Sequence, residues 1–343
     1  MTEREKHGRS EPLVIGHRGA PGYRPEHTRS SYELAFEMGA DAVEPDLVAT
    51  RDGVLVVRHE NEISGTTDVA EHPEFADRRR TTTVDGREHT GFFTEDFDWA
   101  ELQTLRARER LPRVRPASAA FDGTEPLLRL EDLLDIVDAA SERRGRQLGL
   151  VAEVKHATHF ASIGLPLDGL IADALASLPA EHLVVESFEE TVLRQLHERG
   201  LGGRGVYLVE KKGAPFDRVA AEGSDAPSYA EQLTSESLAA FGASAWVQGI
   251  SVDKSLLLGA DGSEEQRADG AALVNLAHHS GLDVFTWTLR PENRFLTPAF
   301  RLAGGKNAFG DWRGEFRAVL ETGVDGIFVD HPDLGRESVG GAA

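Results

Sequence analysis

The feature that most constrains the fold is a repeated alternation of short, β-rich apolar runs with segments of helical periodicity. The apolar runs predict eight strands, at Leu13–Gly16, Ala42–Asp46, Leu148–Val154, Leu183–Glu186, Gly205–Val209, Ala245–Ile250, Asp283–Thr288 and Gly326–Val329. Amphipathic helices are predicted between most of them, at Ser30–Met38, Leu130–Arg144, Leu167–Ser177, Glu189–Arg199, Ala271–His279 and Arg313–Glu321. Strands joined through helices run parallel, so the pattern indicates an α/β protein.

Such an alternation fits either an open, doubly wound sheet or a closed (β/α)₈ barrel. Eight units favour the barrel. Open sheets usually carry a glycine-rich loop after an early strand. GxxxxGK[ST] does not occur in the chain, and the GxGxxG match at Gly200–Gly205 comes before the fifth predicted strand and not after an early one. We therefore expect a (β/α)₈ TIM barrel whose functional side chains lie at the C-terminal ends of the strands.

The barrel domain is predicted to span residues 13–335, with residues 60–125 forming an inserted subdomain after the second strand. This stretch is rich in Thr, Asp, Arg and aromatic residues and lacks long helical periodicity. Long βα loops of a barrel can carry such subdomains. The run Arg78–Arg80 within it is typical of a solvated surface, with a phosphate-facing role as the alternative. Two further loop-rich regions, 211–230 and 290–311, are expected over the barrel mouth.

Composition excludes several classes of function. The chain has 37 Lys and Arg against 58 Asp and Glu, a net charge of −21 that repels nucleic acids and anionic membranes. It has no cysteine, which excludes disulfides, thiolate metal sites and cysteine nucleophiles. No apolar run approaches the roughly 18 residues of a membrane span, and the first dozen residues lack the apolar stretch of a secretory signal. We expect a cytoplasmic protein without membrane insertion.

Polar residues gather where the predicted strands end. His17 and Arg18 follow the first strand, and Glu44 and Asp46 lie two residues apart on one face of the second. Glu153 ends the third strand, with Lys155 two residues on. Three carboxylates from two strands can ligate one divalent cation that prefers oxygen ligands, while capping or salt-bridged acids are the alternative.

A second histidine is predicted to reach the same place. The Asp52-Gly53 turn precedes a run that ends in His59 and folds back as a hairpin on the second strand. Because imidazole titrates near neutral pH, two histidines beside a metal suit general acid–base catalysis.

Taken together, these motifs resemble the glycerophosphodiester phosphodiesterase family. The resemblance rests on several strings from residue 13 to residue 335: His17-Arg18-Gly19-Ala20, Pro25-Glu26-His27-Thr28, Gly39-Ala40-Asp41 with Glu44 and Asp46, Asp52-Gly53 with His59, Glu153-Val154-Lys155, Ser187-Phe188, Thr286-Trp287-Thr288, and residues 323–332. Residues 60–125 and the segment Thr66–Val69 resemble the longer, glycerol-phosphate-releasing bacterial branch.

The resemblance implies a barrel with one divalent metal, Mg²⁺ or Ca²⁺ with Mn²⁺ also suitable, at its C-terminal mouth. It implies roles for nine residues: Glu44, Asp46 and Glu153 as metal ligands, His17 and His59 as the acid–base pair, Arg18 and Lys155 as phosphate contacts, and Phe188 and Trp287 as lining of the alcohol or glycerol pocket. Glu26 would ligate or orient the metal site. The chain departs from the family pattern at Pro45, between the two acids, and at His27, where Asn is usual and a direct role at the metal is the alternative.

The implied reaction is metal-dependent hydrolysis of glycerophosphodiesters, such as glycerophosphocholine or glycerophosphoethanolamine, to sn-glycerol 3-phosphate and an alcohol. We expect His59 as the acid and His17 as the base, through either a cyclic phosphate or direct attack of water. The expected partner is the small-molecule substrate, with no nucleic acid. Two alternatives stay open: a lysophospholipase D-like phosphodiesterase acting on lipids, and a non-catalytic protein that binds phosphodiesters. The sequence does not fix the metal, the head group or the oligomeric state.

Overall fold

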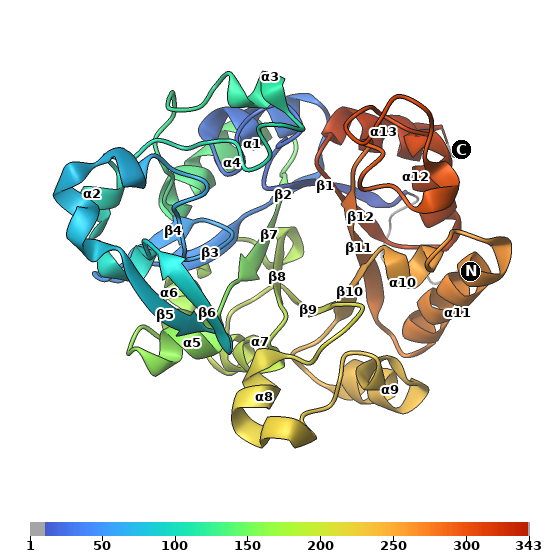
Figure 1. Ribbon diagram of the computed structural model, residues 1–343. Coiled ribbons are helices and arrows are strands. Elements are labelled where there is room, and N and C mark those ends of the chain that lie inside the picture. Colours follow the sequence, from blue (N-terminus) through green and yellow to red (C-terminus); the bar gives the residue numbers. More distant parts are fainter. Residues whose placement is uncertain (1–10, 342–343) are drawn as a thin grey trace.

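The computed structural model describes residues 11–341, so most of the N-terminal segment used to predict a cytoplasmic location lies outside the described residues. One sheet closes into a barrel, in the strand order β2-β1-β12-β11-β10-β9-β8-β7 with β2 paired again to β7. Neighbouring strands around this ring are parallel. The predicted (β/α)₈ barrel is confirmed, and Figure 1 shows its strands around the centre with helices outside them.

The barrel strands are β1 (Leu13–His17), β2 (Ala42–Glu44), β3 (Asp46–Ala49), β7 (Gly149–Val154), β8 (Leu183–Ser187), β9 (Arg204–Val209), β10 (Gly249–Asp253), β11 (Asp283–Leu289) and β12 (Gly326–Val329). Pro45 divides the predicted second strand into β2 and β3, because proline lacks a backbone donor. The predicted strand Ala245–Ile250 is placed too early. Residues 244–248 form a turn in which the Val247 amide donates to Ser244 Oγ at 3.2 Å, so β10 starts at Gly249.

The six predicted helices correspond to α1 (Arg29–Glu37), α4 (Leu130–Arg144), α6 (Leu167–Leu175), α7 (Glu190–Glu198), α11 (Glu264–His279) and α12 (Trp312–Glu321). Helices that the periodicity did not predict are α2 (Trp99–Leu102), α3 (Pro116–Ala119), α5 (Ala157–Ser162), α8 (Phe216–Glu222), α9 (Ser235–Ala243), α10 (Ser255–Leu258) and α13 (Pro332–Gly340). Within residues 11–341, no helix is long and apolar enough to cross a membrane.

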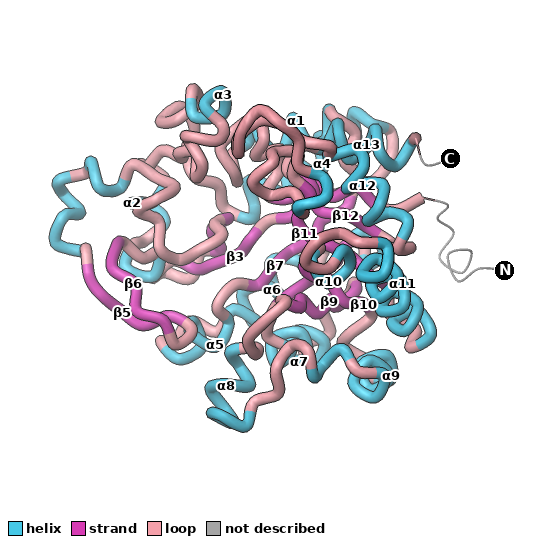
Figure 2. Tube along the Cα trace, turned by 45° about the vertical axis from the view of Figure 1, so that its right-hand side comes forward, coloured by secondary structure: helices cyan, strands magenta, loops and turns pink. Residues whose placement is uncertain are grey.

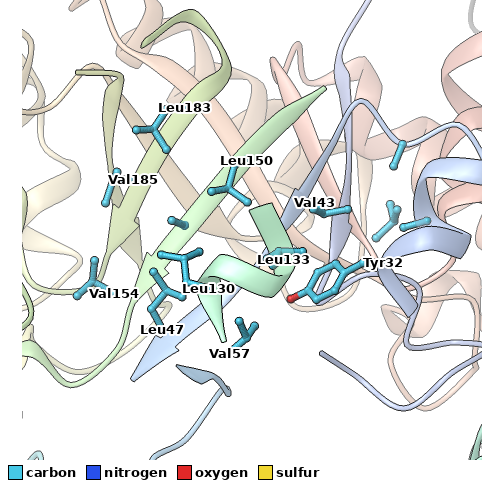
Figure 3. Close-up of a cluster of buried hydrophobic side chains, with 14 of the residues drawn as sticks. Tyr32, Val43, Leu47, Val57, Leu130, Leu133, Leu150, Val154, Leu183 and Val185 are labelled. Carbon is cyan, nitrogen blue, oxygen red and sulfur yellow. The ribbon is translucent and has the colours of Figure 1, made fainter. Parts of the chain in front are cut away.

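Apolar side chains fill the barrel interior and the layer between barrel and helices. The interior holds Ile15, Ala42, Val151, Val206, Phe285 and Phe328. Figure 3 shows part of the outer layer, where Val43, Leu150 and Val185 of the strands pack with Tyr32 of α1 and Leu133 of α4. Since strand residues alternate between the two layers, the next inward positions toward the carboxyl ends carry the polar residues of the site.

The stretch 60–125 holds short helices and a hairpin of β5 (Arg80–Val84) and β6 (Arg87–Gly91). Before it, β4 (Leu55–Val57) pairs antiparallel with β3, so the predicted hairpin that carries His59 is confirmed. The β5–β6 hairpin extends from the side of the barrel in both views (Figures 1 and 2). Its independence as a subdomain stays a prediction.

Candidate active site

The carboxyl ends of the barrel strands open into a cavity of about 1240 Å³. Eight of the nine predicted site residues line it: His17, Arg18, Glu44, His59, Glu153, Lys155, Phe188 and Trp287. The ninth, Asp46, is fully buried beside the other carboxylates. The structure thus brings together residues from five separate barrel strands and from the loop after β4, at the end of the barrel where function was expected.

Glu44, Asp46 and Glu153 each offer an oxygen within 4.8 Å of the oxygens of the other two. Pro45 interrupts the strand without separating them, because β3 pairs with β7 at Asp46 and Glu153 and the Glu153 amide donates to the Pro45 carbonyl at 2.9 Å. Burial and the charge of Asp46 raise the pKa of Glu44 well above its ordinary value. Burial also raises the pKa of Glu153 to about 8, although Lys155 opposes it.

The donor set fits a divalent cation. Glu44 Oε1 and Asp46 Oδ1 are buried and have no hydrogen-bond partner, although the Lys155 ammonium lies 3.4 Å from Asp46 Oδ1. Glu44 Oε2 accepts from the Arg18 amide at 2.8 Å. Buried carboxylate oxygens without partners are costly unless a cation or a donor compensates them. Oxygen ligands of this kind suit Mg²⁺ and Ca²⁺, so this buried group can hold a metal ion.

Asp46 is held in place by His27, the residue that stands where the family usually has Asn. His27 Nε2 lies 2.9 Å from Asp46 Oδ2, and His27 Nδ1 lies 2.7 Å from the hydroxyl of Tyr32. Since both ring nitrogens have partners and the ring is fully buried, His27 orients Asp46 and is not placed to ligate a metal itself. Burial alone would raise the pKa of Asp46, but Lys155, His59 and Arg18 hold it well below its ordinary range.

Both predicted phosphate contacts are also engaged with carboxylates. Lys155 Nζ lies 2.7 Å from Glu153 Oε1 and 3.4 Å from Asp46 Oδ1. Arg18 Nε lies 3.2 Å from Asp46 Oδ2, and its Nη1 lies 3.1 Å from Glu26 Oε2. Glu26 therefore orients Arg18, and it is not one of the acids that converge on the cation position.

His17 is oriented by a clamped carboxylate. Its Nδ1 lies 2.7 Å from Asp330 Oδ1, while Asp330 Oδ2 accepts from Arg115 and Arg290, each at 2.6 Å. Burial opposes ionisation of Asp330, yet the two guanidinium groups hold its pKa well below its ordinary value. An ionised Asp330 must accept the hydrogen bond, which places the proton of neutral His17 on Nδ1 and leaves Nε2 basic. Burial and Arg18 lower the pKa of His17 to about 4.

His59 has a similar arrangement. Its Nδ1 lies 2.5 Å from Glu60 Oε1, and Arg110 pairs with both Glu60, at 2.7 Å, and Glu26, at 2.6 Å. His59 is about one quarter exposed, and burial together with Arg18 and Lys155 lowers its pKa to about 3. Each histidine therefore uses Nδ1 for a carboxylate and keeps Nε2 available on the cavity side.

Aromatic rings form the wall beside the carboxylates. Phe188 and Trp287 pack edge to face with centroids 5.7 Å apart, and Phe188 contacts Tyr229 in the same way at 6.3 Å. Trp287 is fixed by its indole N–H, which donates to the Ser251 carbonyl at 3.3 Å. Lys155 Nζ lies 5.8 Å from the centre of the Phe188 ring.

The β5–β6 turn reaches over one side of the opening. Asp85 in this turn pairs with His156 Nδ1 at 2.5 Å, and a Cβ placed on Gly86 would lie 3.4 Å from the ring of Phe216 in α8. Residues of both segments line the cavity. The turn and α8 thus form a rim arch, defined here as Asp85–Arg87 together with Phe216.

Sequence reasoning assigned no role to several residues that shape the site: Arg110, Arg115, Glu60, Glu186 and Asp330. Asp330 and Glu186 carried a visible signal, since each is an acid at the end of a predicted strand. The two arginines lie in the stretch 60–125, and nothing in their spacing indicates where they go. The Arg78–Arg80 run is not brought to the cavity: Arg78 pairs with Glu101, and Arg80 with Asp96 at 2.5 Å.

Comparison with known proteins places this site in a family of phosphodiester hydrolases. The model of the glycerophosphoryl diester phosphodiesterase family matches residues 17–334. The chain belongs to this family, as its motifs indicated.

Two similar proteins are named glycerophosphodiester phosphodiesterases. One from Haemophilus influenzae is 25% identical over 97% of this chain and 91% of its own length. One from Arabidopsis thaliana is 40% identical over 43% of this chain, and the match spans only 38% of that longer protein.

Solved structures share the fold. A glycerophosphoryl diester phosphodiesterase homologue from Silicibacter pomeroyi superposes with a TM-score of 0.68 at 23% identity, covering 99% of this chain and 97% of its own. A phosphodiesterase from Oleispira antarctica, solved with the product sn-glycerol 3-phosphate, has a TM-score of 0.60 at 17% identity and coverage of 96% and 97%.

Proposed function

We propose that the protein catalyses metal-dependent hydrolysis of glycerophosphodiesters, such as glycerophosphocholine or glycerophosphoethanolamine, to sn-glycerol 3-phosphate and an alcohol. The observation that carries the proposal is the convergence of three buried carboxylates and two carboxylate-oriented histidines on one cavity. The product bound to the Oleispira structural neighbour is of the proposed type.

Glu44, Asp46 and Glu153 would hold one divalent cation, Mg²⁺, Ca²⁺ or Mn²⁺. A cation there supplies positive charge that stabilises the negative charge gathering on the phosphoryl oxygens. Arg18 would add to this by contacting a phosphate oxygen, since its guanidinium borders the cavity next to the carboxylates. Lys155 would contribute a second positive charge from the end of β7.

Acid–base chemistry falls to the two histidines. His17 Nε2 would take a proton from the attacking hydroxyl, and His59 would protonate the oxygen of the leaving alcohol as its bond to phosphorus breaks. An anionic phosphodiester bound between them raises both histidine pKa values, so His59 can take a proton from solvent on Nε2 before it passes this proton to the leaving alcohol, while His17 begins the step neutral. The attacking hydroxyl belongs either to water or to the substrate glycerol; the second route forms a cyclic phosphate that water then opens.

Soluble diesters suit the rim better than lipids do. Of the large apolar residues that are well exposed within residues 11–341, only Val219 borders the cavity. A lipid-cleaving enzyme is expected to surround its opening with such residues.

The test is release of sn-glycerol 3-phosphate from glycerophosphocholine by the purified protein, first with EDTA and then with Mg²⁺, Ca²⁺ or Mn²⁺ restored. We expect product only with a divalent ion, and loss of product in a His17→Ala variant that binds the ion normally. Transient glycerol cyclic phosphate in ³¹P NMR spectra would identify the route through the glycerol hydroxyl. A protein that binds the ion and glycerol phosphate but releases no product from glycerophosphocholine or from a lysophospholipid would contradict the proposal.

A further inference from the structure

A fourth carboxylate lies at the floor of the cavity and has no role in the chemistry above. Glu186 stands near the end of β8, where it pairs in register with Glu153 of β7 and with Val206 of β9. Register partners in parallel strands point to the same side, so Glu186 points into the barrel as they do. It lines the cavity and is only 2% exposed.

One oxygen of this carboxylate has no hydrogen-bond partner. Glu186 Oε2 is buried and makes no hydrogen bond. Among the described residues, the acids whose oxygens converge on one cation position are Glu44, Asp46 and Glu153, and Glu186 stands outside that group. A buried carboxylate oxygen left in this state is costly, because it has lost its hydration and accepts no hydrogen bond in return. A bound molecule that brings a donor would remove the penalty.

The polarity of the cavity indicates which part of a substrate meets Glu186. Arg18 and His17 lie at the end of β1 and Lys155 directly follows β7, so the part of the ring between these two strands suits the phosphate group. Glu186 lies around the barrel at β8, and the apolar ring of Phe188 follows two residues on. A carboxylate repels a phosphodiester anion and accepts a hydrogen bond from a hydroxyl. The β8 side therefore suits the uncharged, hydroxylated part of the molecule.

We propose that Glu186 accepts a hydrogen bond from the terminal free hydroxyl of the glycerol part, the one farthest from the phosphate, and thereby selects phosphate esters of polyols over those of simple alcohols. The inference rests on the proposed function and adds the orientation of the substrate, with the far end of the glycerol toward β8 and the phosphate between β1 and β7. Glu186 contacts substrate in this arrangement and acts on specificity, while the histidines act on bond cleavage.

The experiment compares two ligands by calorimetry on Ca²⁺-loaded protein: sn-glycerol 3-phosphate, and ethyl phosphate, which has the phosphate but no hydroxyl. One hydrogen bond to a charged group corresponds to a factor of roughly 10 to 100 in affinity. We expect the wild-type protein to prefer glycerol 3-phosphate by about this factor. Glu186→Ala should bind both ligands about equally, and Glu186→Gln, which keeps an acceptor oxygen but loses the charge, should show a preference between those of the wild type and Glu186→Ala.

Glu210→Gln is the matched control, because Glu210 lines the outer part of the same cavity. It should keep the wild-type preference. A preference that persists in Glu186→Ala would overturn the assignment, as would equal weakening of both ligands. Hydrolysis of glycerophosphocholine by the wild-type protein is measured separately, so failure of the proposed function appears there and a failed role for Glu186 appears only in the ligand ratio. If Glu186→Ala does not fold, a Glu186→Leu variant takes its place.

Discussion

Replacing Arg115 with methionine removes the guanidinium that pairs with both Glu292, at 2.9 Å, and Asp330, at 2.6 Å. The three side chains are at most 5% exposed. Asp330 keeps Arg290 and His17 as partners. The charge of Glu292 is compensated less well after the change, because its second oxygen, Oε2, is already buried without a hydrogen-bond partner.

Removing one member of a buried ion pair typically destabilises a protein by about 3–5 kcal/mol, because the other charge is left uncompensated. We expect R115M to lower the free energy of unfolding by about 3 kcal/mol in urea titrations at pH 7.5. The double variant R115M/E292Q should regain part of the lost free energy of unfolding, because the neutral amide of Gln does not need the Arg115 guanidinium beside it.

The control is R313M, which breaks a pair with Glu337 whose side chains are 61% and 50% exposed. Exposed pairs contribute little, so this change should stay within about 0.5 kcal/mol of wild type. The reasoning is refuted if R115M also stays within about 1 kcal/mol, or if R115M/E292Q is as unstable as the sum of the two single variants.

Three further outcomes are expected. E44Q should weaken Ca²⁺ or Mg²⁺ binding at least roughly tenfold by calorimetry, since it removes one of three converging charges. H17N should lower kcat by about 10²–10⁴ with a smaller change in KM, measured on glycerophosphocholine with folding checked by circular dichroism. Burial raises the pKa of Glu189 from 4.5 to about 7, so its contribution to stability is present below pH 4.5 and is lost as the pH rises through 7. E189Q should therefore be about 3 kcal/mol more stable than wild type at pH 8.5 and equal to it at pH 4 in urea titrations; equal stability at both would contradict the shift.

Much of the fold could be predicted because barrel strands and covering helices leave different periodicities in the sequence. The strand predicted at 245–250 shows the limit of this method. Ala245-Trp246-Val247 is as apolar as a strand, but these residues belong to the turn closed by the hydrogen bond from Val247 to Ser244, and β10 starts only at Gly249. Short helices such as α8 and α10 are also invisible to periodicity, since one or two turns present too few positions for a stripe.

The site could be predicted from the sequence where its residues stand at the ends of predicted strands. Residues at strand ends converge whenever the strands close into a ring, so Glu44 and Glu153 could be paired from the sequence. Arg110 and Arg115 could not, because their positions depend on the path of an irregular stretch. The arginines that fix the carboxylates behind the two histidines were therefore the part of the site that only three-dimensional packing reveals.

The rim arch has a consequence for how the opening admits molecules. It is built from the β5–β6 turn and α8, which meet where Gly86 approaches Phe216, and the pairing of Asp85 with His156 anchors the turn to the loop after β7. None of the residues that converge on the cation position belongs to it. Exchanging the arch for a longer or shorter turn would change the width of the entrance while the carboxylates and histidines stay in place, so entry and chemistry can be altered independently of each other.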